Sequence, residues 1–194
     1  MSQALSERIK RLPASATLAM AAKARELKNE GKDIIGLSLG EPDFNTPDFI
    51  KEAAIEAINA DYNSYTPVDG YAELKEAICE KFKRDNDLDY APNQIVVSTG
   101  AKQSIANAVQ VLINPGDDVL LVAPYWVSYS AIVILAEGNP IEIRSDIETD
   151  FKITPAQLEA AITPKTKWVM LNSPTNPSGA TYSKEEHEAR ANVL

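Results

Sequence analysis

Short apolar segments alternate with helix-patterned segments from Pro92 onward, and this alternation constrains the fold more than any other feature of the chain. The segments at 95–98, 119–122, 141–143 and 168–171 have the length and the apolar content of buried strands. Between them, apolar residues recur at helical spacing, as in Ile105, Val109 and Leu112. Strands that alternate with helices form parallel sheets whose faces the helices cover. We therefore predict an α/β fold with a mostly parallel sheet covered by helices.

The part of the chain before this alternation is predicted to be mainly helical. A helix with Leu18 and Leu27 on its apolar face is expected to end at Gly31, and a short strand is expected at 34–39. Thr46 and Pro47 have the residue types of a helix N-cap and first turn, and a further helix is expected over 74–82. The stretch 63–70 between these two helices has no regular pattern.

Two capping boxes are predicted near the C-terminal end, where Thr154 precedes Gln157 and Ser183 precedes Glu186. The helix after Ser183 departs from an amphipathic pattern, because His187 and Arg190 stand where a core-facing stripe calls for apolar residues.

Composition excludes several classes of function. One histidine, His187, and one cysteine, Cys79, leave no cluster for a metal and no internal disulfide. The net charge of −9 argues against a nucleic-acid partner. No apolar run reaches the length of a membrane span, and the first residues lack the apolar centre of a signal peptide. We expect a cytoplasmic protein with no membrane partner.

A turn that joins a predicted strand to a predicted helix is a candidate phosphate site. Ser98 to Ser104 carry Gly100 at the point where backbone N–H groups and the positive end of the helix would face one direction. Such turns also use glycine only for its backbone freedom, so the turn alone leaves both interpretations open.

Two other segments leave predicted strands at the carboxyl edge, where ligands of α/β sheets bind. Trp126 follows the strand at 119–122 and could stack on a flat ring, although an indole packed under a loop is equally compatible. Asn176 lies between Pro174 and Pro177, which restrict the backbone around its amide. We expect Trp126 and Asn176 to border one cavity.

These segments, taken in order with Gly40-Glu41-Pro42-Asp43-Phe44 and Tyr65, resemble bacterial class I aminotransferases of the aspartate aminotransferase type. The resemblance implies an incomplete large domain of the type I pyridoxal-phosphate transferase fold, preceded by an N-terminal helical arm. It further implies an N-terminal arm and small-domain segment over 1–45 and a partial large domain over 46–194.

The resemblance assigns a role to each matching residue. Gly100, Ala101 and Lys102 correspond to the turn that holds the phosphate of pyridoxal 5'-phosphate, Trp126 to the residue that stacks on its ring, and Asn176 to the amide that binds its ring oxygen. Tyr65 corresponds to a tyrosine that reaches the cofactor phosphate of the other subunit of a homodimer. Gly40, with Trp126 and Asn176, corresponds to substrate contacts.

The implied activity is transfer of an amino group between an amino acid, such as aspartate, and a 2-oxo acid. Chains of this family are about twice as long, and the later half carries the Schiff-base lysine, so no catalytic residue is assigned in the 194-residue chain. The isolated chain is therefore expected to be inactive. Two alternatives stay open: a non-catalytic or degenerate subunit that binds a full-length partner, and a lyase of the same fold.

Overall fold

The computed structural model describes residues 4–37, 40 and 42–194. The chain forms two compact units, one made of Met1–Lys23 with Ile105–Leu194 and the other of Ala24–Ser104. Each unit is described by itself. The division predicted between residues 45 and 46 stays a prediction.

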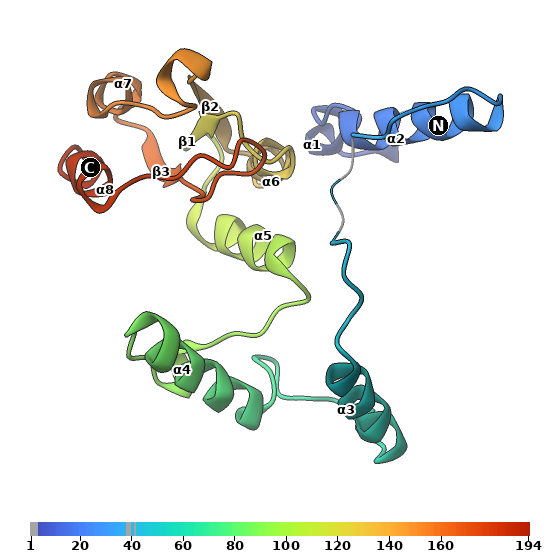
Figure 1. Cartoon of the computed structure of the whole chain (residues 1–194). Coiled ribbons are helices and arrows are strands. Elements are labelled where there is room, and N and C mark those ends of the chain that lie inside the picture. Colours follow the sequence, from blue (N-terminus) through green and yellow to red (C-terminus); the bar gives the residue numbers. More distant parts are fainter. Residues whose placement is uncertain (1–3, 38–39, 41) are drawn as a thin grey trace. The chain divides into compact units, whose positions relative to one another are not determined.

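A three-stranded parallel sheet forms the centre of the first unit (Figure 1). Its order is β2-β1-β3, with β1 at Asp118–Ala123, β2 at Asn139–Arg144 and β3 at Thr166–Met170. Leu121 of β1 is in register with Glu142 on one side and Met170 on the other. The predicted α/β class, the parallel sheet and the strands at 119–122, 141–143 and 168–171 are confirmed.

Alternate residues of β1 enter two separate core clusters, because successive side chains of a strand point to opposite faces. Val119 and Leu121 belong to a cluster with Val109, Ile113, Tyr129, Ile132, Val133 and Met170. Leu120 and Val122 belong to a second cluster with Ile143, Ile153 and Leu158. Both faces of β1 are thus covered by apolar side chains, as the buried run at 118–122 requires.

Helices precede, connect and follow the strands of this sheet along the chain. They are α5 at Ala101–Leu112, α6 at Ser128–Leu135, α7 at Pro155–Ala161 and α8 at Lys184–Ala191, with a short helix α1 at Glu7–Lys10 and a 3-10 turn η3 at Ile147–Thr149. Thr154 accepts a hydrogen bond from the Gln157 N–H, and Ser183 accepts one from the Glu186 N–H. Both predicted capping boxes are confirmed.

Most of the remaining helical residues lie in the second unit, whose helices are α3 at Asp48–Asn59 and α4 at Ala72–Asn86, followed by a 3-10 turn η2 at Pro92–Gln94. Helix α2 at Ala16–Asn29 starts in the first unit, ends in the second and is followed by Gly31 at φ +82°. The helices expected at these places, including the N-terminal arm, are therefore present. The predicted Thr46 cap is wrong, because the N-cap of α3 is Pro47, which makes no side-chain hydrogen bond.

Two predicted strands do not form. Residues 95–98 are outside any ladder, and the Val97 N–H donates to the Asp69 carbonyl oxygen at 3.0 Å. Residues 34–37 are likewise outside any ladder, and Ser38 and Leu39 lie outside the described residues. A strand requires a neighbour that accepts and donates its backbone hydrogen bonds, and the structure describes no such neighbour for either segment.

Helix α8, whose sequence departs from an amphipathic pattern, carries a buried charged residue, Arg190. Arg190 is 3% exposed, and its guanidinium carbon lies 3.6 Å from the centroid of the Tyr182 ring. Its Nε and Nη2 atoms are buried without a hydrogen-bond partner among the described residues. Burial lowers the pKa of the Arg190 guanidinium, while Tyr182 and Glu186 act in the opposite direction.

Arg190→Leu is expected to stabilise the first unit by about 1–3 kcal/mol, because an apolar side chain removes a buried charge whose donors are unsatisfied. The loss of the contact with Tyr182 offsets about 0.5–1 kcal/mol of this gain. Urea unfolding followed by tryptophan fluorescence measures the change. Lys184→Leu on the same helix is the control, since Lys184 is exposed, and a stability loss in Arg190→Leu would contradict the expectation.

No helix within the described residues is both long enough and apolar enough to cross a membrane. The same residues contain no group of three or more His, Cys, Asp or Glu side chains arranged to hold a metal ion.

Candidate functional site

The Gly100 turn, residues 98–102, lies in the second unit and is a candidate phosphate-binding segment. Gly100 has φ +82°, and a Cβ atom at this position would meet nothing within 4 Å. Helix α5 begins at the next residue, as predicted. The Ala101 N–H has no acceptor in the described part of the chain, whereas the Gly100 N–H donates to Ser98 O at 2.8 Å. The turn therefore offers open space, an exposed N–H that no described residue accepts, and the positive end of a helix, which together suit an anion.

The turn is also held by one of its own side chains. The Thr99 N–H donates to the Gln103 side-chain oxygen, and the Gln103 and Ser104 N–H groups donate to Gly100 O. These bonds fix the shape of the turn and occupy the Thr99 amide. Of the predicted contacts, Gly100, Ala101 and Lys102 are all solvent-exposed.

Tyr65 and Gly40 are also accessible in the second unit. Tyr65 has a relative exposure of 107%, so its ring extends away from the rest of the chain. Gly40 is exposed and has no neighbour within 4 Å of a Cβ position. The Tyr65 side chain and the Gly40 backbone are therefore both accessible to a ligand or to another chain.

Asn176 lies in the first unit beside a small cavity at the carboxyl end of the sheet. The Asn176 N–H donates to the Asn172 side-chain oxygen at 2.9 Å, and the Thr175 hydroxyl donates to Asn172 O at 2.7 Å. These bonds fold the loop after β3 and leave the side-chain amide of Asn176 without a hydrogen-bond partner among the described residues. The cavity is lined by Val122, Tyr125, Tyr129, Met170, Leu171, Asn172, Thr175, Asn176 and Tyr182.

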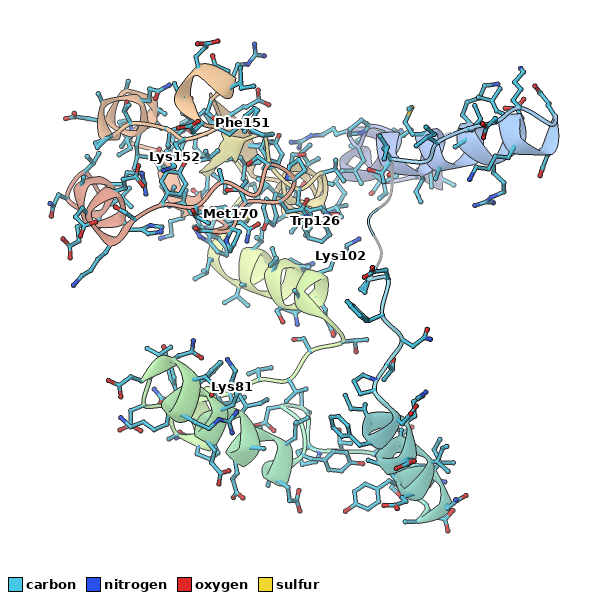
Figure 2. The ribbon with its side chains drawn as sticks, viewed as in Figure 1. Lys81, Lys102, Trp126, Phe151, Lys152 and Met170 are labelled. Carbon is cyan, nitrogen blue, oxygen red and sulfur yellow. The ribbon has the colours of Figure 1, made fainter. Side chains whose placement is uncertain are left out.

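Trp126 does not line this cavity. Its half-buried indole, labelled in Figure 2, packs edge-on against Tyr129 with ring centroids 5.5 Å apart. Tyr129 in turn lines the cavity together with Asn176. The structure thus connects Trp126 to the Asn176 cavity through Tyr129, and a cavity bordered by both Trp126 and Asn176 stays a prediction.

Tyr125 and Tyr129 are the residues of this cavity to which the sequence analysis gave no role. Their rings are stacked with centroids 6.4 Å apart. Burial raises the pKa of the Tyr129 hydroxyl, a group that can donate a hydrogen bond. The available signal was their place directly after the strand at 119–122, at the carboxyl edge where ligands of α/β sheets bind.

The model of the family "Aminotransferase class I and II" matches residues 32–193. The aspartate/prephenate aminotransferase of Cereibacter sphaeroides is 55% identical over 190 residues, which are 98% of this chain and 48% of the relative. The aspartate aminotransferase of Bacillus sp. strain YM-2 is 51% identical over 193 residues, which are 100% of this chain and 49% of the relative. The chain therefore spans about half the length of the curated relatives it matches.

Solved structures agree with these matches. The aspartate aminotransferase of Rhizobium meliloti matches with a TM-score of 0.93 and 48% identity, over 98% of this chain and 48% of that one. The Thermus thermophilus aspartate aminotransferase with maleate matches with a TM-score of 0.91 and 44% identity, over 97% of this chain and 50% of that one. The strand-end loops, the Gly100 turn and the family match over residues 32–193 lead to one assignment: the chain belongs to the class I and II aminotransferases.

Proposed function

We propose that the chain is the cofactor-binding front part of an enzyme that transfers an amino group between an amino acid and a 2-oxo acid with pyridoxal 5'-phosphate. The observation that carries this proposal is the Gly100 turn, which has free space around Gly100 and an exposed Ala101 N–H that no described residue accepts. Relatives named for aspartate, or for aspartate and prephenate, support aspartate as the amino donor. Their names also favour an aminotransferase over the lyase alternative.

The residues present fit such a cofactor. A phosphate group takes hydrogen bonds from backbone N–H groups at a helix start, which the Gly100 turn provides. A phenolic ring oxygen takes a hydrogen bond from an amide, and the Asn176 amide has no competing partner among the described residues. When bound, pyridoxal phosphate supplies the conjugated ring that withdraws electrons from the bonds at the α-carbon of the amino acid.

Each proposed residue has a role that follows from its chemistry. Gly100, Ala101 and Lys102 hold the phosphate, Asn176 orients the ring through its oxygen, and Trp126 contributes an aromatic face. Tyr65 supplies a hydroxyl to the phosphate of a second subunit in a homodimer. Gly40 offers its backbone to the substrate carboxylate, beside contacts from Trp126 and Asn176.

Trp126→Ala and Asn176→Ala test the ring contacts. Each is expected to weaken pyridoxal phosphate binding by about tenfold at most, because stacking or one neutral hydrogen bond contributes about 0.5–1.5 kcal/mol. Isothermal titration calorimetry of the chain with pyridoxal phosphate measures the dissociation constants. Asn107→Ala is the control for Asn176, since Asn107 is an exposed amide on α5 and is expected to bind normally.

Absence of binding to the unsubstituted chain would contradict the proposed function. Binding that is equally tight in Asn176→Ala and in Asn107→Ala would remove Asn176 from the proposed site.

A further inference from the structure

A loop of the second unit, residues 62–71, carries Tyr65 and is closed at its base. The rings of Tyr62 and Tyr71, at its two ends, have centroids 5.6 Å apart. Within the loop, the Gly70 N–H donates to Pro67 O at 3.0 Å, and the Thr66 hydroxyl donates to the same oxygen at 2.9 Å. This segment, named here the Tyr65 loop, is therefore a closed and internally bonded loop rather than an open linker.

Asp69 ties the Tyr65 loop to helix α4. Its carboxylate accepts a hydrogen bond from Lys75 Nζ, and the Lys75 side chain is only 12% exposed. The hydrogen bond from Lys75 lowers the pKa of the Asp69 carboxyl. The Asp69 side chain is 42% exposed, so the pair is sheltered from water on the Lys75 side only.

Two neighbouring residues of the loop, Asp69 and Gly70, contact Val97, which directly precedes the Gly100 turn. Val97 N–H donates to Asp69 O at 3.0 Å. Gly70, at φ +104°, lies so close that a Cβ atom would stand 2.6 Å from Val97 Cγ2. The contacts therefore run from the Tyr65 loop through Asp69 and Gly70 to Val97, and from there along the backbone into the Gly100 turn.

We propose that Asp69 and Lys75 are positioning residues that hold the Tyr65 loop and the Gly100 turn as one rigid piece. The inference rests on the proposed function, in which both segments bind a cofactor phosphate. The Gly100 turn would serve the cofactor of its own subunit and Tyr65 that of the neighbouring subunit. One ion pair then sets the position of a phosphate contact in each of two sites.

The experiment compares Asp69→Asn with Asp87→Asn in the full 194-residue chain. Asp87 forms a matched, exposed pair with Lys83 on α4 at 3.1 Å. Hydrogen exchange of the Val97 amide, measured by NMR without any ligand, reports the hydrogen bond from Val97 to Asp69. Calorimetry reports the affinity for pyridoxal phosphate. In Asp69→Asn we expect Val97 exchange to accelerate about threefold to tenfold and the dissociation constant to rise by a similar factor.

Asp87→Asn is expected to change neither quantity, and Asp69→Glu, which keeps the charge, is expected to restore most of the protection of Val97. Unchanged Val97 exchange in Asp69→Asn would overturn the inference. Faster exchange with unchanged cofactor affinity would overturn it too, because the pair would then serve only the stability of the loop. Failure of the unsubstituted chain to bind pyridoxal phosphate would instead overturn the proposed function, and with it the role of the pair in cofactor binding.

Discussion

Borohydride treatment of the chain with pyridoxal phosphate is expected to leave no stoichiometric adduct on any single lysine, and assays with aspartate and a 2-oxo acid are expected to show only background turnover. Transamination requires a lysine amine that bonds covalently to the cofactor and moves the proton at the α-carbon. Enzymes accelerate such reactions by at least about a millionfold, so the expected loss is close to complete.

The lysines nearest to the candidate motifs do not fit this role. Lys102 stands in the Gly100 turn, beside the proposed phosphate position. Lys184 is exposed on α8, and its Nζ lies 3.8 Å from Glu188 Oε1. Lys152 Nζ, between α7 and α8 in Figure 2, donates to the Glu186 carboxylate at 3.1 Å.

Mass spectrometry after proteolysis locates any reduced adduct, and a full-length relative such as the aspartate aminotransferase of Rhizobium meliloti, treated in the same way, is the positive control. A single modified lysine at full occupancy, together with turnover above background, would contradict the expectation. Scattered modification at low occupancy would be ordinary surface chemistry and would agree with it.

The sequence predicted the strands that form the sheet of the first unit. The run 119–122 is apolar and begins and ends with the β-branched Val119 and Val122, and the neighbours that pair with it, β2 and β3, follow it in the sequence. The segment 95–98 has the same pattern but no ladder, because Val97 bonds to Asp69 in a loop. Residue patterns report a preference for extended backbone, whereas a ladder also depends on a partner that local sequence does not specify.

For the candidate site, the sequence predicted backbone features better than side-chain directions. The start of α5 after Gly100 follows from local turn chemistry, and the structure has it where expected. The direction of Trp126 depends on which neighbour offers an aromatic edge, and Tyr129 provides it. The burial of Arg190 was likewise not predictable, since it depends on the Tyr182 ring from the preceding loop.

Leu121→Ala is expected to lower the stability of the first unit strongly, because Leu121 is packed at its centre. Leu121 is 0% exposed in the central strand, in one cluster with Val133 and with Tyr129 of the Asn176 cavity. Truncation removes buried methyl groups and leaves a cavity that the surrounding strands and helices cannot fill. The free energy of unfolding is expected to fall by about 3–5 kcal/mol, a large part of the roughly 5–15 kcal/mol typical of a domain.

Urea unfolding followed by tryptophan fluorescence reports this change in the first unit, because Trp126 and Trp168 both pack against the cluster that contains Leu121. Leu18→Ala is the matched control, since it deletes the same atoms from a side chain that is 68% exposed, and it is expected to change stability by less than about 0.5 kcal/mol. Equal losses in the two variants would show that β1 is not the centre of a packed core. A selective loss in Leu121→Ala, accompanied by weaker pyridoxal phosphate binding below the unfolding transition, would show that the core supports the Tyr125–Tyr129 wall of the Asn176 cavity.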